Sequence, residues 1–385
     1  MDRLNVRSGK DQFEYLRGIA ILFVLTTHFS LENEFFAERE LSSPFYSGVE
    51  LFFLISGYGI AASLLSRPFD WRKYVLKRCR RIYPSLLAML AACFLVNLLM
   101  QHMELNDWAF ETYVRTNDMQ WVDSLRILSG TYILGNGGEY AFGPMWYLSV
   151  QMQFYAVMGV LAALAKSEVN RRKLLFAAAG LICVVCLACR ISVLAGSRLI
   201  HPLLRYIIGW RIDIPFWGVL LYGAAERLPK AAVATPSPQL SRLLSVLLLC
   251  VPVLVLMRTG SDMSTLDGNP LLTGFGYPVC ILCYGLLVLL CATGRKTFLP
   301  QKSRVLAYLS SRSYLLYLYN LLGLLLGWLV INQFFPQIFY TGSYLHYGVA
   351  QLFIGGFFIV ALAEADYQLI EKRLIQNRIR QETDR

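Results

Sequence analysis

The chain has 385 residues, of which 56% are hydrophobic and 16% charged, and its formal net charge is +11. Its mean hydropathy of +0.48 exceeds what a soluble domain needs to fill a core. The composition therefore indicates an integral membrane protein and excludes a soluble or a disordered chain.

Ten apolar runs are dense enough to form membrane helices, and most have about the 20 residues that a helix needs to cross a bilayer. They lie at residues 13–31, 45–65, 82–100, 144–165, 174–192, 205–225, 243–258, 273–293, 305–331 and 346–369. The sixth and seventh runs are the weakest, since one contains two charged residues and the other is short. We predict an all-α bundle of about ten transmembrane helices, with one transmembrane domain over residues 1–385 and no separate soluble domain.

Lysine and arginine are concentrated in alternate loops, after the second, fourth, sixth and eighth runs, and at both termini. Basic residues of short loops stay on the cytoplasmic side of a membrane. Both termini are therefore predicted to be cytoplasmic, which requires an even number of spans. The net charge of +11 is mostly this topology signal, so nucleic acid is not expected as a partner.

The first run carries Arg17 and His28 inside apolar sequence. A charged residue at the centre of a membrane helix costs about 2.5–3.5 kcal/mol, so such residues are functional candidates. Eleven residues at about 100° each give about three turns plus 20°, which places both on one helix face about 16 Å apart. A functional pair is one interpretation. The other is a snorkelling Arg17 and a His28 that packs against a neighbouring helix.

The second run begins FYSGVELFFLISGY, with Glu50 near its outer end, at about the depth expected for His28. A carboxylate there can hold one imidazole nitrogen as a donor and leave the other free as a base. The alternative is a structural ion pair. Gly48 and Gly57 favour close approach of this run to a neighbouring helix, and we expect it to pack tightly against the first.

The loop RKYVLKRCRRIYP concentrates basic residues at the inner boundary, and Arg78 and Arg81 lie three residues apart, on one helix face. Such a cluster can reflect topology or lipid contact, or it can bind the phosphates of a soluble anionic cofactor. If it binds phosphates, the order of basic loop, Arg17 and then His28 with Glu50 suits transfer of an activated group from a cytoplasmic donor to an outer acceptor.

The nine cysteines lie in the predicted spans or on the cytoplasmic side, so disulfides are not expected. Cys183, Cys186 and Cys189 are spaced three apart, as are Cys280 and Cys283. Because no histidine or carboxylate accompanies them, helix packing explains this spacing better than a metal site. No metal is predicted.

The run LRGIAILFVLTTHF, followed by GVELFFLISGY, RCRRIYP and GPMWYLSVQMQFY, resembles the integral-membrane acyltransferase family three, the membrane O-acyltransferases of cell-envelope sugars. SYLLYLYN at 313–320 and IEKR at 370–373 agree further, so the resemblance extends over nearly the whole chain. It implies a multi-pass protein of the bacterial cytoplasmic membrane. The implied reaction is transfer of an acyl group, usually acetyl, from cytoplasmic acyl coenzyme A (acetyl-CoA) to a hydroxyl of a glycan or lipid-linked sugar.

The resemblance also implies roles for single residues. His28 matches the base of the family, Arg17 lies near the path of the thioester, and Glu50 supplies the carboxylate of the catalytic group. Arg78 and Arg81 match the motif that holds the coenzyme phosphates. Roles at the substrate or in supporting structure are implied for Trp146, Tyr155, Arg211, Asp213 and Asn320.

Four positions depart from the pattern of the family. Glu50 stands where aspartate is common, Gln151 and Met152 stand where two glutamates are common, and Asn320 stands where histidine is common. We interpret these departures as a subgroup difference that affects the acceptor. Whether His28 activates the acceptor or carries the acyl group itself stays open at this stage.

The alternative function is a transporter or flippase of an envelope glycan precursor, which also needs buried charges. A transporter is expected to consist of repeated halves, and residues 205–385 do not repeat the early motifs. The sequence therefore favours an enzyme. The acceptor, the acyl chain and the oligomeric state do not follow from the sequence.

Overall fold

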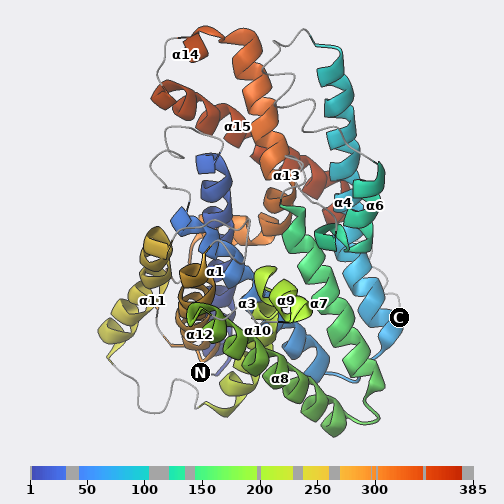
Figure 1. Ribbon diagram of the computed structural model, residues 1–385, viewed down its shortest axis with the longest axis vertical. Helices are drawn as coiled ribbons and strands as arrows, with labels where there is room; N and C mark the ends of the chain where they lie inside the picture. Colours follow the sequence, from blue (N-terminus) through green and yellow to red (C-terminus); the bar gives the residue numbers. More distant parts are fainter. Residues whose placement is uncertain are drawn as a thin grey trace. The chain divides into compact units, whose positions relative to one another are not determined.

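A computed structural model describes residues 2–31, 43–103, 121–134, 144–196, 201–228, 237–259, 269–295, 297–300, 302–340 and 344–374. Within these ranges all regular secondary structure is helical, and no strand occurs (Figure 1). The all-α prediction is confirmed. Long helices form because the apolar runs contain few glycines and prolines and because a membrane requires every backbone group to be paired within its own segment.

The helices follow one another with short connections. Their bounds are α1 (Asp2–Leu31), η1 (Ser43–Ser47), α3 (Gly48–Leu65), α4 (Trp71–Gln101), α6 (Trp121–Ser129), η3 (Tyr132–Leu134), α7 (Met145–Leu164), α8 (Glu168–Leu194), α9 (Pro202–Gly209), α10 (Ile214–Arg227), α11 (Pro238–Thr259), η5 (Leu272–Gly276), α12 (Tyr277–Ala292), α13 (Arg304–Phe334), α14 (Gln337–Tyr340), α15 (Tyr344–Asp366) and η6 (Tyr367–Glu371). Among the described residues, eight helices are long and apolar enough to cross a membrane. The chain is a multi-pass helical membrane protein.

Two of the ten predicted spans are not among these eight. The first, 13–31, lies in the continuous helix α1, whose polar residues Glu14, Arg17 and His28 lower its hydropathy. The sixth, 205–225, is not one helix but two, since a turn at residues 210–213 separates α9 from α10. The predicted count of ten therefore includes two segments that length and composition alone do not identify.

Local sequence explains where several helices begin and end. The Ser167 side chain accepts a hydrogen bond from the backbone N–H of Asn170 and caps the start of α8, a common arrangement at helix N-termini. Soon after α8 ends, Gly196 has a φ of +80°, a conformation that glycine adopts without strain. Pro202 occupies the first turn of α9, where its missing N–H costs no hydrogen bond.

The described chain forms two compact units. The first consists of residues 1–31, 36–70 and 154–313, and the second of residues 32–35, 71–153 and 314–385. Helices α7 and α13 each contribute residues to both units.

Helix α3 lies in the interior of the first unit, and most of its side chains are buried. A Cβ atom on Gly57 would overlap the Pro215 carbonyl oxygen, so only glycine allows α10 to lie this close. A Cβ atom on Gly48 would lie 2.7 Å from the Ala20 carbonyl oxygen of α1. Both close approaches predicted from these glycines are confirmed.

The second unit has its own apolar core. Met100 of α4 packs there with Leu325, Trp328 and Leu329 of α13. A buried polar contact adds to it, because Ser85 of α4 and Tyr319 of α13 each donate a 2.9 Å hydrogen bond to the carboxylate at the end of α15, Asp366. That carboxylate immediately precedes the π-helix η6.

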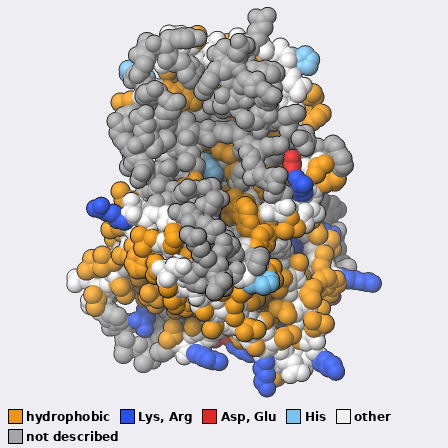
Figure 2. Space-filling model, viewed as in Figure 1, with side chains coloured by type: hydrophobic (Ala, Val, Ile, Leu, Met, Phe, Trp, Pro, Cys, Tyr) orange, Lys and Arg blue, Asp and Glu red, His pale blue; other side chains and the backbone are white. Residues whose placement is uncertain are grey.

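The surface of the described helices is strongly apolar. Leu95, Leu181 and Phe353 have exposed fractions of 64%, 66% and 71%. Figure 2 shows hydrophobic side chains over much of the described part of one face, with lysine and arginine side chains at its margins. In a bilayer such side chains contact lipid tails and incur no cost of contact with water, which agrees with a multi-pass membrane protein.

Candidate functional site

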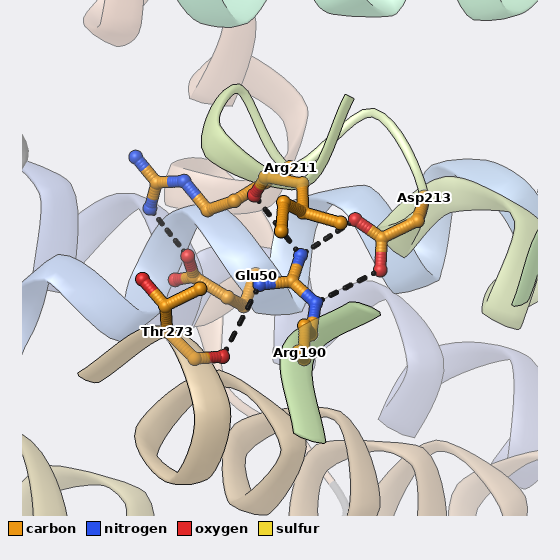
Figure 3. Close-up of polar contacts among 6 residues, drawn as sticks. Glu50, Arg190, Arg211, Asp213 and Thr273 are labelled. Carbon is orange, nitrogen blue, oxygen red and sulfur yellow. Dashed lines mark hydrogen bonds and ion pairs between the residues drawn. The ribbon is translucent and has the colours of Figure 1, made fainter. Parts of the chain in front are cut away.

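Four charged side chains meet inside the first unit. Glu50, Arg190, Arg211 and Asp213, which we call the four-charge cluster, have exposed fractions of 0%, 0%, 2% and 0%. Figure 3 shows that they converge from α3, from α8 and from the turn that separates α9 from α10. Two arginines and two carboxylates give the cluster a formal charge of zero, which is what a buried ionic group in a membrane helix bundle requires.

Arg190 makes the largest number of hydrogen bonds in the cluster. Its Nη2 donates to Asp213 Oδ1 at 2.6 Å and its Nε to Oδ2 at 3.3 Å, a bidentate pair. It also donates to the carbonyl oxygens of Ile208, at 3.2 Å, and Thr273, at 3.4 Å. Arg190 therefore connects α8 to the end of α9, the start of α10 and the π-helix η5.

Arg211 has an unusual backbone conformation for its residue type. Its φ of +58° is in the left-handed region, which costs a non-glycine residue about 1–2 kcal/mol. The N–H of Ile212 bonds to the Ile207 carbonyl and the N–H of Arg211 to the Ile208 carbonyl. This is a Schellman ending of α9, with arginine at the position that glycine usually occupies. The side chain at this position must therefore contribute something that glycine cannot.

That contribution is an ion pair with Glu50. Arg211 Nη1 donates to Glu50 Oε1 in the first turn of α3. The guanidinium carbons of Arg211 and Arg190 lie 5.1 Å and 5.4 Å from the centre of the Tyr277 ring, so one aromatic face contacts both cations. Glu50 Oε2 is buried and accepts no hydrogen bond from any described residue.

Two predicted pairings are wrong. In the described part of the chain Glu50 accepts from Arg211 and not from His28, so the Glu50–His28 pair expected from the sequence is not formed. Arg211 and Asp213, taken together as a charged pair, each bind a different partner. The physical reason is the turn at 210–213, which sends the two side chains toward different helices.

Arg17 and His28 lie on the single continuous helix α1, so the 20° offset expected from helical periodicity applies. Both side chains are partly buried. Among the described residues, none forms a hydrogen bond with the imidazole of His28. One helix face therefore presents a guanidinium and, about 16 Å along the axis, an imidazole without a protein hydrogen bond.

Arg78 and Arg81 lie in the first half of α4, one turn apart on the same face, as the sequence predicts. Arg78 is partly buried, and its guanidinium carbon lies 5.4 Å from the centre of the Tyr74 ring. Arg81 is exposed. The arrangement can present two guanidinium groups to an anion at the end of the second unit's longest basic segment.

The remaining predicted residues lie on α7 and α13. Trp146 is buried in the first turn of α7 and Tyr155 is partly buried nine residues later, so the two point to nearly opposite sides of the helix. Asn320 lies in α13 and is 1% exposed, with its Nδ2 donating to the Tyr317 carbonyl at 2.9 Å. Trp146 and Tyr155 therefore do not share one binding face.

Arg190 and Asp366 were missed by the sequence analysis. Arg190 stands inside the fifth apolar run and Asp366 inside the tenth, so the argument that identified Arg17, the cost of a charge within a membrane helix, applies to both. The signal was present, but both residues lie near the ends of their runs, where charged side chains are common.

Comparison with known proteins places these features in a family. A family described as an acyltransferase domain matches residues 10–363. The putative membrane-bound transacylase BcsY of Komagataeibacter xylinus is 31% identical over 180 residues, which cover 44% of this chain and 42% of that protein. The alignment thus spans less than half of the relative's length. No solved structure matches this chain.

Proposed function

Because this chain belongs to that acyltransferase family, we propose that it transfers an acyl group, acetyl in the simplest case, from cytoplasmic acyl coenzyme A to a hydroxyl of a cell-envelope glycan or lipid-linked sugar. The proposed location is the bacterial cytoplasmic membrane. One observation supports the chemistry most directly. The imidazole of His28 lies on a partly buried helix face with Arg17 and has no hydrogen bond from the described residues.

In the proposed reaction His28 is the general base. A neutral imidazole nitrogen takes the proton of the acceptor hydroxyl while the hydroxyl oxygen attacks the thioester carbonyl carbon. A new C–O bond forms, the C–S bond breaks, and the coenzyme thiolate leaves and takes the proton from the imidazolium. Arg17 is proposed to stabilise the negative charge that develops on the thioester oxygen, as a fixed cation in a site of low dielectric can do.

Glu50 is proposed to act through the four-charge cluster and not through His28. Its carboxylate holds Arg211, which keeps the end of α9 and the start of α10 in place beside α3. The neutral cluster is a rigid support for the helices of the first unit.

The proposed function is tested by the wild-type protein in lipid nanodiscs with acetyl-CoA and a panel of neutral and charged glycosides. We expect release of the coenzyme thiol that depends on the acceptor, together with an acetylated glycoside detected by mass spectrometry. Absence of acetylated product across the panel would contradict the proposal. Uptake of an unmodified glycoside by sealed vesicles would instead support a transporter.

Arg78 and Arg81 are proposed to hold the coenzyme phosphates. We expect the double substitution Arg78→Ala and Arg81→Ala to raise the Kd for coenzyme A at least tenfold, because a hydrogen bond to a charged group contributes about 1.5–3 kcal/mol. Isothermal titration of purified protein measures this. The matched control removes the same charge from the other side of α4, with the exposed Arg72 and Arg80 both changed to alanine. Equal weakening in both variants would indicate a general effect of charge.

A further inference from the structure

Two buried amide side chains in the second unit each leave one polar atom without a partner. Asn320 is 1% and Gln151 4% exposed. Asn320 Nδ2 donates to the Tyr317 carbonyl, which leaves Asn320 Oδ1 without a donor. The Tyr147 hydroxyl donates to Gln151 Oε1 at 3.4 Å, which leaves Gln151 Nε2 without an acceptor.

Exchange of the amide oxygen and nitrogen does not remove this deficit. A carbonyl oxygen can only accept, so the atom of Asn320 that faces the Tyr317 carbonyl must be the nitrogen. The Tyr147 hydroxyl can donate or accept, but it satisfies only one of the two polar ends of Gln151 in either orientation. One end of each amide is therefore unsatisfied whichever way the groups are assigned.

The two amides belong to one set of contacts between α7 and α13. The rings of Tyr147 and Tyr317 lie edge to face, with centroids 5.2 Å apart. The Tyr317 hydroxyl also donates to the carbonyl of Pro144, directly before α7. We call Gln151, Asn320 and these two tyrosines the amide cluster, and all four of its side chains are uncharged.

A third buried amide shows what a packing explanation looks like. Gln351 Oε1 also has no donor, while Nε2 of the same residue donates to the Leu324 carbonyl at 2.7 Å. A Cβ atom on Gly327 would lie 2.7 Å from Gln351 Oε1, so this amide fills the crossing of α13 and α15 against glycine backbone. Gln151 and Asn320 make no such contact with a glycine.

Buried polar atoms in proteins nearly always have partners, and in hydrocarbon no water is available to supply one. A ligand explains why two of them are left unpaired in one cluster. We propose that the amide cluster binds hydroxyl groups of an uncharged sugar acceptor. One hydroxyl accepts from Gln151 Nε2 and one donates to Asn320 Oδ1. The ligand must be neutral because a charged sugar would bring an ion next to four uncharged side chains, with no counter-ion among them.

This inference rests on the proposed function only in naming the ligand as the acceptor. Its first test is kinetic, with methyl β-D-glucoside as the neutral acceptor and the methyl glycosides of glucuronic acid and glucosamine as charged ones. Gln151→Met and Asn320→Leu replace each amide with an apolar group of similar size. We expect each variant to raise the KM for methyl β-D-glucoside about 3- to 10-fold, as loss of one uncharged hydrogen bond does. The double variant should show about the product of the two effects.

The KM for acetyl-CoA should stay unchanged in these variants, and so should both constants in the matched control Gln351→Met. A purely structural role would move both KM values together and lower thermal stability. We expect thermal stability to be retained, since removal of an unsatisfied buried amide also removes its desolvation cost. An unchanged KM for the glucoside, or wild-type preference for a charged glycoside, would overturn the inference.

A second test needs no catalysis and separates this inference from the proposed function. Without acetyl-CoA, methyl β-D-glucoside should raise the thermal unfolding midpoint of the wild type and of Gln351→Met, but not that of the double variant. If the wild type shows this shift and transfers no acetyl group, the binding site stands and the proposed function fails. If no shift occurs with the wild type, the inference is wrong whatever the enzyme catalyses.

Discussion

Replacement of His28 by alanine is expected to lower the rate of acyl transfer at least 100-fold, because a positioned general base contributes about 10²- to 10⁴-fold. The partly buried imidazole has no hydrogen bond from the described residues, so its removal should leave the packing of α1 nearly unchanged. The measurement is release of the coenzyme thiol by purified protein, with the yield of folded protein in detergent determined alongside.

The matched control is His102→Ala. His102 is exposed after the end of α4, and its ring contacts only the Leu98 carbonyl of the same helix. This control should transfer acyl groups at the wild-type rate. If His28→Ala retains more than a tenth of the wild-type rate, His28 is not the base and the imidazole has a packing role.

Arg211→Gly is expected to destabilise the protein by about 3–5 kcal/mol, because it leaves the Glu50 carboxylate buried without its cation. This result is informative because glycine removes the backbone strain at a φ of +58°. By conformation alone the substitution should stabilise the protein by about 1–2 kcal/mol. The midpoint of thermal unfolding in detergent measures which effect is larger.

The control for that substitution adds Glu50→Gln to Arg211→Gly. The double variant has no uncompensated charge at this position, so most of the lost stability should return. If both variants unfold at the same midpoint, the loss comes from the missing side-chain volume and not from the carboxylate. A single variant as stable as the wild type would show that the ion pair contributes nothing to stability.

Much of the fold was predictable because hydropathy and helical periodicity are local properties. Runs of about 20 apolar residues predict the long helices directly, and eight helices among the described residues meet that description. The shared face of Arg17 and His28 follows from the helical repeat alone. The close approach of α3 to its neighbours was predictable for the same reason, since a glycine shows where a helix surface lacks a side chain.

The partners of the buried charges were not predictable in this way. Glu50 and Arg211 are 161 residues apart along the chain, and nothing local distinguishes Arg211 from His28 as a partner for Glu50. The sixth run also reads as one apolar segment, although it is divided by a left-handed turn at an arginine. That conformation opposes local preference, and the ion pair with Glu50 offsets its cost.

By itself the sequence determined that this protein is a helical membrane protein, which family it resembles, and that Arg17 and His28 lie on one helix face. These properties depend on composition and on the repeat of a single helix. Only the tertiary structure decided that Glu50 pairs with Arg211, that Arg190 pairs with Asp213, and that Gln151 and Asn320 each retain an unpaired polar atom. Ion pairing and hydrogen-bond satisfaction depend on which side chains from distant segments meet, and packing of the helices sets that.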